Sequence, residues 1–108
     1  MIIRAWRGRA GRARKGAYPK HFHKAVIPEL RQVPGFLGAQ LSRRVEGDAV
    51  EFLVLTRWKS MAAVSAFAGP DVDKAVVEPG AVAALDDFDD TVRHYEVLEE
   101  VVPPSPIG

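Results

Sequence analysis

Alternate side chains of a strand point to opposite faces, and apolar residues recur at such positions along four stretches of the chain. We predict strands over residues 2–7, 36–45, 49–58 and 91–98. Helical segments are predicted between the first and second strands and between the third and fourth. The resulting order is the split β-α-β-β-α-β arrangement, which predicts an α+β, ferredoxin-like fold with an antiparallel sheet.

The first helix is predicted to begin near Tyr18-Pro19, because proline is favoured at the first helical position, and to run toward Gln32. Its apolar stripe repeats at helical spacing. The stripe consists of Phe22, Val26, Leu30 and Val33. Pro28 lies inside this pattern and should kink or divide the helix.

The second helix is predicted to begin after Ser60, which is a good N-cap, and to end at Gly69-Pro70. Asp71 can cap a further short helix over residues 72–77, which Pro79-Gly80 would end. The acidic sequence at 86–90 is expected to form an exposed loop.

The third strand is apolar on both faces. Phe52 and Val54 point to one side, and Leu53 and Leu55 point to the other. Such a strand needs cover on both faces, but a chain of 108 residues supplies helices for only one. We therefore expect a second copy to pack sheet to sheet, as a twofold homodimer.

Charge is distributed unevenly although the net charge is only +1. Eight Lys or Arg residues and no acid precede Glu29, whereas ten acids and two basic residues follow from Met61 onward. Such asymmetry indicates either a nucleic-acid arm or two chain ends that neutralise each other. The basic stretch "RGRAGRARKG" lacks the aromatic residues that stack on bases, so we favour neutralisation and expect no nucleic-acid partner.

The remaining composition points to a cytoplasmic protein with no membrane partner. There is no cysteine and no apolar run near the ~20 residues that span a bilayer, and the N-terminus lacks the order of a signal peptide. The chain has no P-loop, GxGxxG, GxSxG or HExxH motif, so no metal and no cofactor is predicted. Residues 100–108 should form a loosely held tail behind a domain of residues 1–99.

Three stretches resemble the antibiotic biosynthesis monooxygenase family, a family of dimeric α+β barrels. They are "VPGFLGAQLSRR", "FLVLTRWKSMAAVSAFAG" and "VRHYEVL", and the resemblance spans about residues 1–99. The family includes cofactor-independent monooxygenases of polyphenolic or quinone-forming substrates, haem-degrading enzymes, and members with no assigned reaction.

The resemblance to the haem-degrading branch fails at its catalytic positions. That branch carries an Asn, a Trp and a His at the positions that the resemblance matches to Arg7, Phe67 and Val77 of this chain. Haem iron needs an axial ligand, which Val77 cannot provide. His21 or His23 could replace it only in a rearranged pocket, so haem degradation is the weakest of the alternatives.

The resemblance implies a pocket between the sheet and the helices, and the residues suggest how it is lined. We expect Arg7 and Trp58 on the helix-facing side of their strands. On a helical wheel His23 flanks the apolar stripe whereas His21 points away, so His23 is the candidate general base. Catalysis is assigned to His23 and Arg7. A hydrophobic, aromatic ligand is assigned to Tyr18, Phe22, Trp58 and Phe67.

Each assignment has a structural alternative. Trp58 can be a core or dimer-interface aromatic, Arg7 can pair with Glu96, and His23 can be a partly buried helix-flank residue. The predicted function is accordingly a cofactor-independent monooxygenase of an aromatic or polyketide-like molecule. The alternative is a non-catalytic dimer that binds such a molecule.

Overall fold

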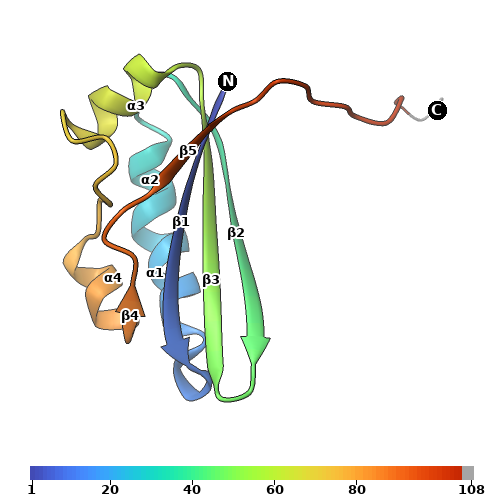
Figure 1. Cartoon of the computed structure of the whole chain (residues 1–108). Helices are drawn as coiled ribbons and strands as arrows, with labels where there is room; N and C mark the ends of the chain where they lie inside the picture. Colours follow the sequence, from blue (N-terminus) through green and yellow to red (C-terminus); the bar gives the residue numbers. More distant parts are fainter. Residues whose placement is uncertain (106–108) are drawn as a thin grey trace.

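The computed structural model describes residues 1–105 and contains one five-stranded sheet with helices against one face (Figure 1). The strands are β1 (Ile2–Gly11), β2 (Phe36–Glu46), β3 (Ala49–Trp58), β4 (Asp87–Phe88) and β5 (Arg93–Glu96). The helical elements are a 3₁₀ turn (Arg12–Arg14), α1 (Ala17–His21), a π-helical turn (Phe22–Val26), α2 (Ile27–Leu30), α3 (Met61–Ala68) and α4 (Pro79–Ala84).

Strand β1 lies in the middle of the sheet. It pairs antiparallel with β3 along its whole length, from Ile2 opposite Trp58 to Gly11 opposite Ala49. On its other side β1 pairs with β5 near its start and with β4 near its end, and β2 lies outside β3. All of these pairs are antiparallel, which confirms the predicted ferredoxin-like fold.

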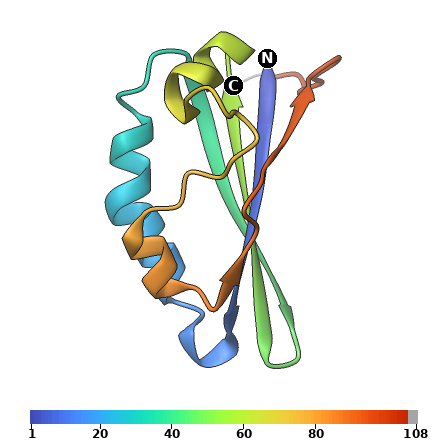
Figure 2. The same cartoon turned by 60° about the vertical axis from the view of Figure 1, so that its left-hand side comes forward.

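The helices cover only one face of the sheet (Figures 1 and 2). The four largest fully buried side chains, each 0% exposed, all lie in this layer. They are Trp58, Phe52, Val50 and Val64. No element of the described chain covers the opposite face, which we call the outer face.

The first helical region is continuous, but its hydrogen-bond pattern changes before Pro28. The amide of Ile27 donates to the carbonyl of Phe22, five residues earlier. Proline has no amide hydrogen and its ring clashes with the carbonyl four residues before it, so a wider turn relieves the conflict. Because a π-turn contains more residues than an α-turn, it rotates α1 relative to α2. Pro28 was expected to kink or divide the helix, and the structure shows a change of winding in the turn before it.

The segment after α3 differs most from prediction. Residues 72–77 form no helix, and Lys74 instead makes a β-bridge with Thr91. Pro79 does not end a helix but begins α4, where its missing amide hydrogen costs nothing. The predicted acidic loop contains the short strand β4.

Strand β1 is also longer than predicted, because the glycines near its end do not break it. Gly8 lies where β1 meets Leu85, and a Cβ at Gly8 would come within 2.7 Å of the Leu85 Cδ1 atom. A larger residue would push Leu85 out of the core, so this glycine serves close packing within a strand.

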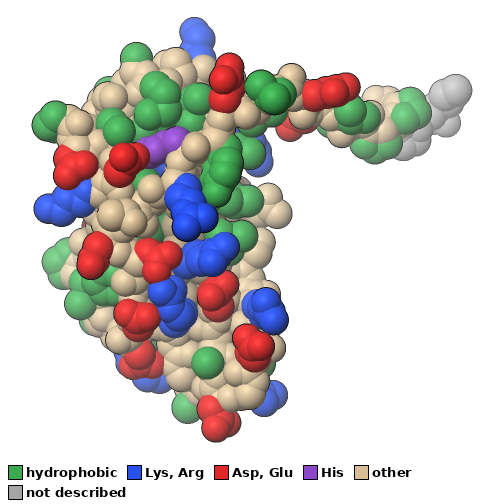
Figure 3. All heavy atoms as spheres, viewed as in Figure 1, with side chains coloured by type: hydrophobic (Ala, Val, Ile, Leu, Met, Phe, Trp, Pro, Cys, Tyr) green, Lys and Arg blue, Asp and Glu red, His purple; other side chains and the backbone are tan. Residues whose placement is uncertain are grey.

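The basic N-terminal stretch and the acidic C-terminal stretch lie beside each other, as the neutralisation hypothesis predicts. Arg9 pairs with Asp87 and Asp89 at 3.0 and 2.5 Å, and Arg14 pairs with Asp86 at 2.7 Å. Figure 3 shows basic and acidic side chains intermixed over this side of the molecule. These pairs account for three of the acids that made the charge pattern lopsided.

Beyond β5 the chain leaves the domain as an extended segment (Figure 1). Its apolar side chains Leu98, Val101 and Val102 are 89, 82 and 73% exposed. The division into a domain of residues 1–99 and a tail of residues 100–108 stays a prediction, and residues 106–108 lie outside the described part. No helix among the described residues is long and apolar enough to cross a membrane.

Candidate functional site

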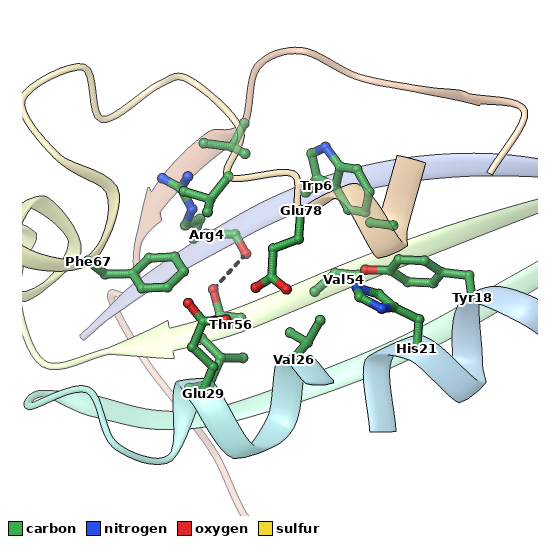
Figure 4. A pocket seen from close by; sticks show the side chains of 14 residues that line it. Arg4, Trp6, Tyr18, His21, Val26, Glu29, Val54, Thr56, Phe67 and Glu78 are labelled. Atoms are coloured by element: carbon green, nitrogen blue, oxygen red, sulfur yellow. Dashed lines mark hydrogen bonds between the residues drawn. The ribbon is translucent and has the colours of Figure 1, made fainter. Parts of the chain in front are cut away.

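A cavity of about 80 Å³ lies between the helix-facing side of the sheet and the helices (Figure 4). Its walls are mainly apolar and aromatic, with a few polar groups. The apolar lining residues are Trp6, Tyr18, Val26, Leu30, Val54, Phe67, Val76, Ala81 and Val92. The polar and charged ones are Arg4, His21, Glu29, Thr56 and Glu78. A concave, mainly apolar space with few polar groups is typical of a small-molecule site.

The sheet supplies the floor of the cavity through the even-numbered residues of β1 and β3. Arg4 lies opposite Thr56 and Trp6 lies opposite Val54, so these side chains share one face. The Trp6 indole Nε1 donates to the Asp89 carbonyl at 2.7 Å, and its ring lies 5.8 Å from that of Tyr18. Trp6 is therefore held in place as one wall.

The buried Arg4 guanidinium ties the segment after α3 to the sheet. It donates to the carbonyls of Val72 at 2.6 Å and of Lys74 at 3.0 Å, and it contacts His94 Nε2 at 2.9 Å. Burial lowers the pKa of Arg4, and the nearby charge of Asp73 acts in the opposite direction. With its donors engaged in this way, Arg4 is a structural tether.

His94 takes part in the Arg4 interaction in a single tautomer. Its Nε2 faces an Arg4 donor, so it must accept, and its Nδ1 lies 3.4 Å from an Asp73 carboxylate oxygen, to which it donates. Burial and the Arg4 charge lower the pKa of His94, while Asp73 opposes the shift. A neutral imidazole is thus favoured between the two charged groups.

Two carboxyl groups meet at the cavity from different elements. Glu29 comes from α2 and Glu78 from the residue before α4, and both side chains point into the space between them (Figure 4). A hydrogen bond with Glu78 raises the pKa of Glu29, and burial and the Glu78 charge add to the shift. Protonation of Glu29 is therefore more favourable beside Glu78 than it is for an isolated glutamate.

Tyr18 lies deeper, against the core. Burial first, and then the charge of Glu78, raise the pKa of its phenol, so Tyr18 stays protonated and can donate a hydrogen bond. The sequence placed Tyr18 and Phe67 at a ligand site, and the structure brings both to the cavity.

Phe22 and Trp58 lie elsewhere. Phe22 is buried behind Tyr18, with 6.3 Å between the ring centroids. Trp58 packs between Phe36 and Phe67 at 5.6 and 5.1 Å. Its indole donates to the Thr56 hydroxyl at 2.8 Å. Neither residue lines the cavity. Trp58 lies in the packed core, which is the structural alternative given for it in the sequence analysis.

The expectation that Arg7 faces the helices is wrong. Trp58 pairs with Ile2, so the helix-facing positions of β1 are the even ones, and Arg7 lies on the outer face beside Leu53 and Tyr95. The alternative partner Glu96 also fails, because it lies opposite Ile2 at the other end of the strand pairing.

The expectation that His23 lies beside the cavity is also wrong. The α-helical wheel assumes a constant rotation per residue, but the π-turn before Pro28 rotates the first part of the helix. As a result His21 lines the cavity and His23 is exposed.

The sequence analysis missed several lining residues. The positions of Arg4 and Trp6 were open to prediction, because these residues share a strand face with Ile2, which pairs with Trp58. The meeting of Glu29 and Glu78 was not open to prediction from the sequence, because only the tertiary path of the segment after α3 brings Glu78 to α2. Among the described residues no group of three or more His, Asp or Glu side chains is placed to hold a metal ion.

The family model for antibiotic biosynthesis monooxygenase matches residues 1–79. The chain therefore belongs to this family, as the sequence resemblance predicted. No match to a curated protein was found.

Solved structures of the same fold are similar over almost the whole chain. One is the haem degrader MhuD of Mycobacterium tuberculosis, with two haems bound (26% identity, 94% of this chain and 100% of that chain, TM-score 0.57). Another is the monooxygenase from the gene ActVA-Orf6 of Streptomyces coelicolor in complex with nanaomycin D (18% identity, 96% and 92%, TM-score 0.59). A third is a dimeric ferredoxin-like protein from an uncultured marine organism (12% identity, 93% and 98%, TM-score 0.57).

Proposed function

We propose that this protein is a cofactor-independent monooxygenase of a small hydroxylated aromatic molecule, and that the reaction takes place in the cavity of Figure 4. The observation that carries the proposal is the juxtaposition of aromatic walls with a carboxyl pair in a member of this family. The walls would hold a ring, and the carboxyl pair would take its proton.

The proposed reaction needs no external reductant because the substrate supplies all four electrons that reduce dioxygen. Glu78 accepts the phenolic proton, and the resulting phenolate transfers one electron to dioxygen. The two radicals combine to form a carbon–oxygen bond at a ring carbon. That carbon then loses its proton while the oxygen–oxygen bond breaks, a carbonyl forms, and the second oxygen leaves as water. Overall, a phenol and dioxygen give a quinone and water.

The surroundings of Glu78 suit it to this role. Its neighbour Glu29, whose pKa the hydrogen bond with Glu78 raises, is the group that would pass a proton to the leaving oxygen. Tyr18 remains protonated beside the same carboxylate and can orient the substrate oxygen. The apolar walls exclude water, which strengthens each of these interactions.

Haem does not fit the cavity as it stands. Sites for drug-sized ligands occupy about 300–1,000 Å³, and a porphyrin is at least that large, whereas this cavity is about 80 Å³. The similar structure of MhuD has two haems bound, and a haem titration tests whether this protein differs. We expect no Soret shift when haem is titrated into the protein.

The same small volume favours one rival function, binding without turnover. A cavity of this size admits a ligand only partly, and a protein that merely holds a ring at the cavity mouth would need no general base. In that case a ligand would co-purify unchanged, and the carboxyl pair would be dispensable for binding.

Oxygen uptake with a panel of hydroquinones, naphthols and anthrones separates the two functions. We expect uptake with stoichiometric quinone or ketone formation, and a 10²- to 10⁴-fold lower kcat in the Glu78→Gln variant, as for loss of a general base. Glu99→Gln, in the exposed C-terminal segment, is the matched control and should be unchanged. Inactivity across the panel, or equal rates for Glu78→Gln and the wild type, would leave only the binding function.

We further propose that the functional unit is a cytoplasmic homodimer joined through the outer faces of the sheets. This face carries apolar side chains, including the half-exposed Leu37 and Tyr95, both at 51%. Burial of such a surface is the main driving force of association. Light scattering should give twice the 11.8 kDa of one chain, and a monomer at micromolar concentration would contradict the proposal.

A further inference from the structure

His21, which lines the cavity, carries a buried ring nitrogen that has no hydrogen-bond partner among the described residues. The residue lines the cavity, and its ring lies beneath Tyr18 with 6.0 Å between the ring centroids (Figure 4). The Nε2 atom is inaccessible to solvent and has no hydrogen-bond partner among the described residues. Burying a polar atom unpaired is unfavourable, so native proteins rarely do so without a functional reason.

The position of the His21 ring is built into the packing of α1 against α4. A Cβ on Gly80 would lie 2.6 Å from both Cε1 and Nδ1 of His21, which is too close for any side chain. The backbone of Gly80 does not itself require glycine, because its φ lies outside the left-handed region. The missing side chain at position 80 therefore serves to make room for the imidazole.

The charges around the cavity indicate which ligands can reach His21. Glu29 and Glu78 face the same space, so a carboxylate or phosphate would be repelled. Arg4 offers no compensation, since it is engaged with the Val72 and Lys74 carbonyls and with His94. An uncharged ligand with a hydroxyl or carbonyl group meets no such penalty.

The size of the cavity limits the ligand further. About 80 Å³ is roughly half of the ~150 Å³ of an engineered cavity that binds benzene. One ring can therefore enter only in part, and its remainder would lie toward the exposed rim at Glu29 and Val76.

We propose that His21 Nε2 is the hydrogen-bonding site for the oxygen of an uncharged, single-ring phenol or quinone. The choice of this substrate class rests on the proposed function. A neutral imidazole nitrogen accepts a hydrogen bond from a hydroxyl in one tautomer and donates one to a carbonyl in the other. The same atom can thus follow the oxygen of the substrate as it changes from hydroxyl to carbonyl.

Binding of phenol, benzoate and benzene, measured by NMR titration without oxygen, tests the proposal independently of turnover. We expect the wild type to bind phenol at least tenfold more tightly than benzoate or benzene. His21→Leu should weaken phenol binding about tenfold, which corresponds to about 1.4 kcal/mol, and leave benzene binding unchanged. His23→Leu is the matched control on the same helix and should bind phenol normally.

Two further variants distinguish the loss of a hydrogen bond from a folding defect. His21→Gln keeps a polar end group and should recover part of the phenol affinity lost in His21→Leu. Gly80→Ala should weaken phenol binding by displacing the ring, whereas Gly16→Ala, where an added Cβ meets nothing within 4 Å, should not.

The outcomes separate this proposal from the proposed function. Unchanged phenol affinity in His21→Leu, or no preference of the wild type for phenol, would overturn the role of His21. If phenol binding depends on His21 but no phenol is oxidised, His21 keeps its role and the monooxygenase function fails.

Discussion

The two faces of the sheet are built from alternate residues of the same strands, but they differ in every other respect. Along β3 the even residues Phe52 and Trp58 are 0% exposed under the helices, whereas the odd residues Leu53 and Leu55 are only half-buried. The helix-facing side holds the cavity with its carboxyl pair and His21. The outer face holds arginines and exposed aromatic surface. A shift of one residue along a strand therefore exchanges a site residue for an interface residue.

Truncation of Trp58 should show the largest difference between the faces. Trp58→Ala should lower the free energy of unfolding by about 3–5 kcal/mol, because it removes a fully buried aromatic side chain and leaves a cavity. Leu55→Ala should cost less, and its cost should depend on protein concentration if the outer face is a dimer interface. Urea unfolding at two concentrations measures both. Equal, concentration-independent costs would contradict the distinction.

A charge introduced on the outer face should dissociate the proposed dimer. Leu53→Asp places a carboxylate at the centre of this face, where a partner sheet would leave it buried, so the mass should fall from twice 11.8 kDa to 11.8 kDa. Val82→Asp, on the helical layer at a site that is 49% exposed, should leave the mass unchanged. Light scattering measures both, and a dimer that survives Leu53→Asp would place its interface elsewhere.

The contact between Arg4 and His94 on the helix-facing side predicts that the free energy of unfolding falls at acidic pH. The pKa of His94 is lowered in the fold by burial and by Arg4. Below the ordinary histidine pKa the unfolded chain therefore binds more protons, and the free energy of unfolding falls as pH decreases. His94→Gln should remove this slope, whereas His23→Gln should retain it. Denaturant unfolding between pH 7 and 5 measures the slope, and a wild-type profile without it would contradict the tether.

The carboxyl pair of Glu29 and Glu78 predicts a smaller dependence of the free energy of unfolding on pH, with the opposite sign. Since the pKa of Glu29 is raised in the fold, the native state binds more protons just above the ordinary glutamate pKa. The free energy of unfolding should therefore decrease as pH rises through that window. Glu29→Gln, which mimics the protonated partner, should flatten the profile relative to the wild type. Glu99→Gln is the control, and a profile that Glu29→Gln leaves unchanged would argue against a shared proton.

The sequence was sufficient for elements that local rules determine. An apolar run predicted β3, and Ser60 caps α3 as expected, with its hydroxyl accepting from the Ala63 amide at 3.2 Å. The order of strands and helices predicted the fold, and the resemblance of three stretches predicted the family. These features depend on neighbours in sequence, or on a pattern shared by related chains.

The site was harder to predict because it depends on contacts distant in sequence. The segment after α3 takes its path from Arg4, which binds carbonyls about seventy positions away. That path brings Glu78 to Glu29. His21 was missed because Pro28 alters the winding of the helix before it, which a helical wheel cannot represent. Arg7 was misplaced because the parity of β1 is fixed by its register with β3.

The two faces of the sheet can be distinguished directly, since we propose that the ligand binds on the helix-facing side. The chain has two tryptophans, and only the Trp6 indole lines the cavity, while Tyr95 reports on the outer face. Hydroquinone titrated into the protein without oxygen should shift the NMR signal of the Trp6 indole and leave the Tyr95 ring signals unchanged. Shifts at Tyr95 with an unperturbed Trp6 would place the site on the other face.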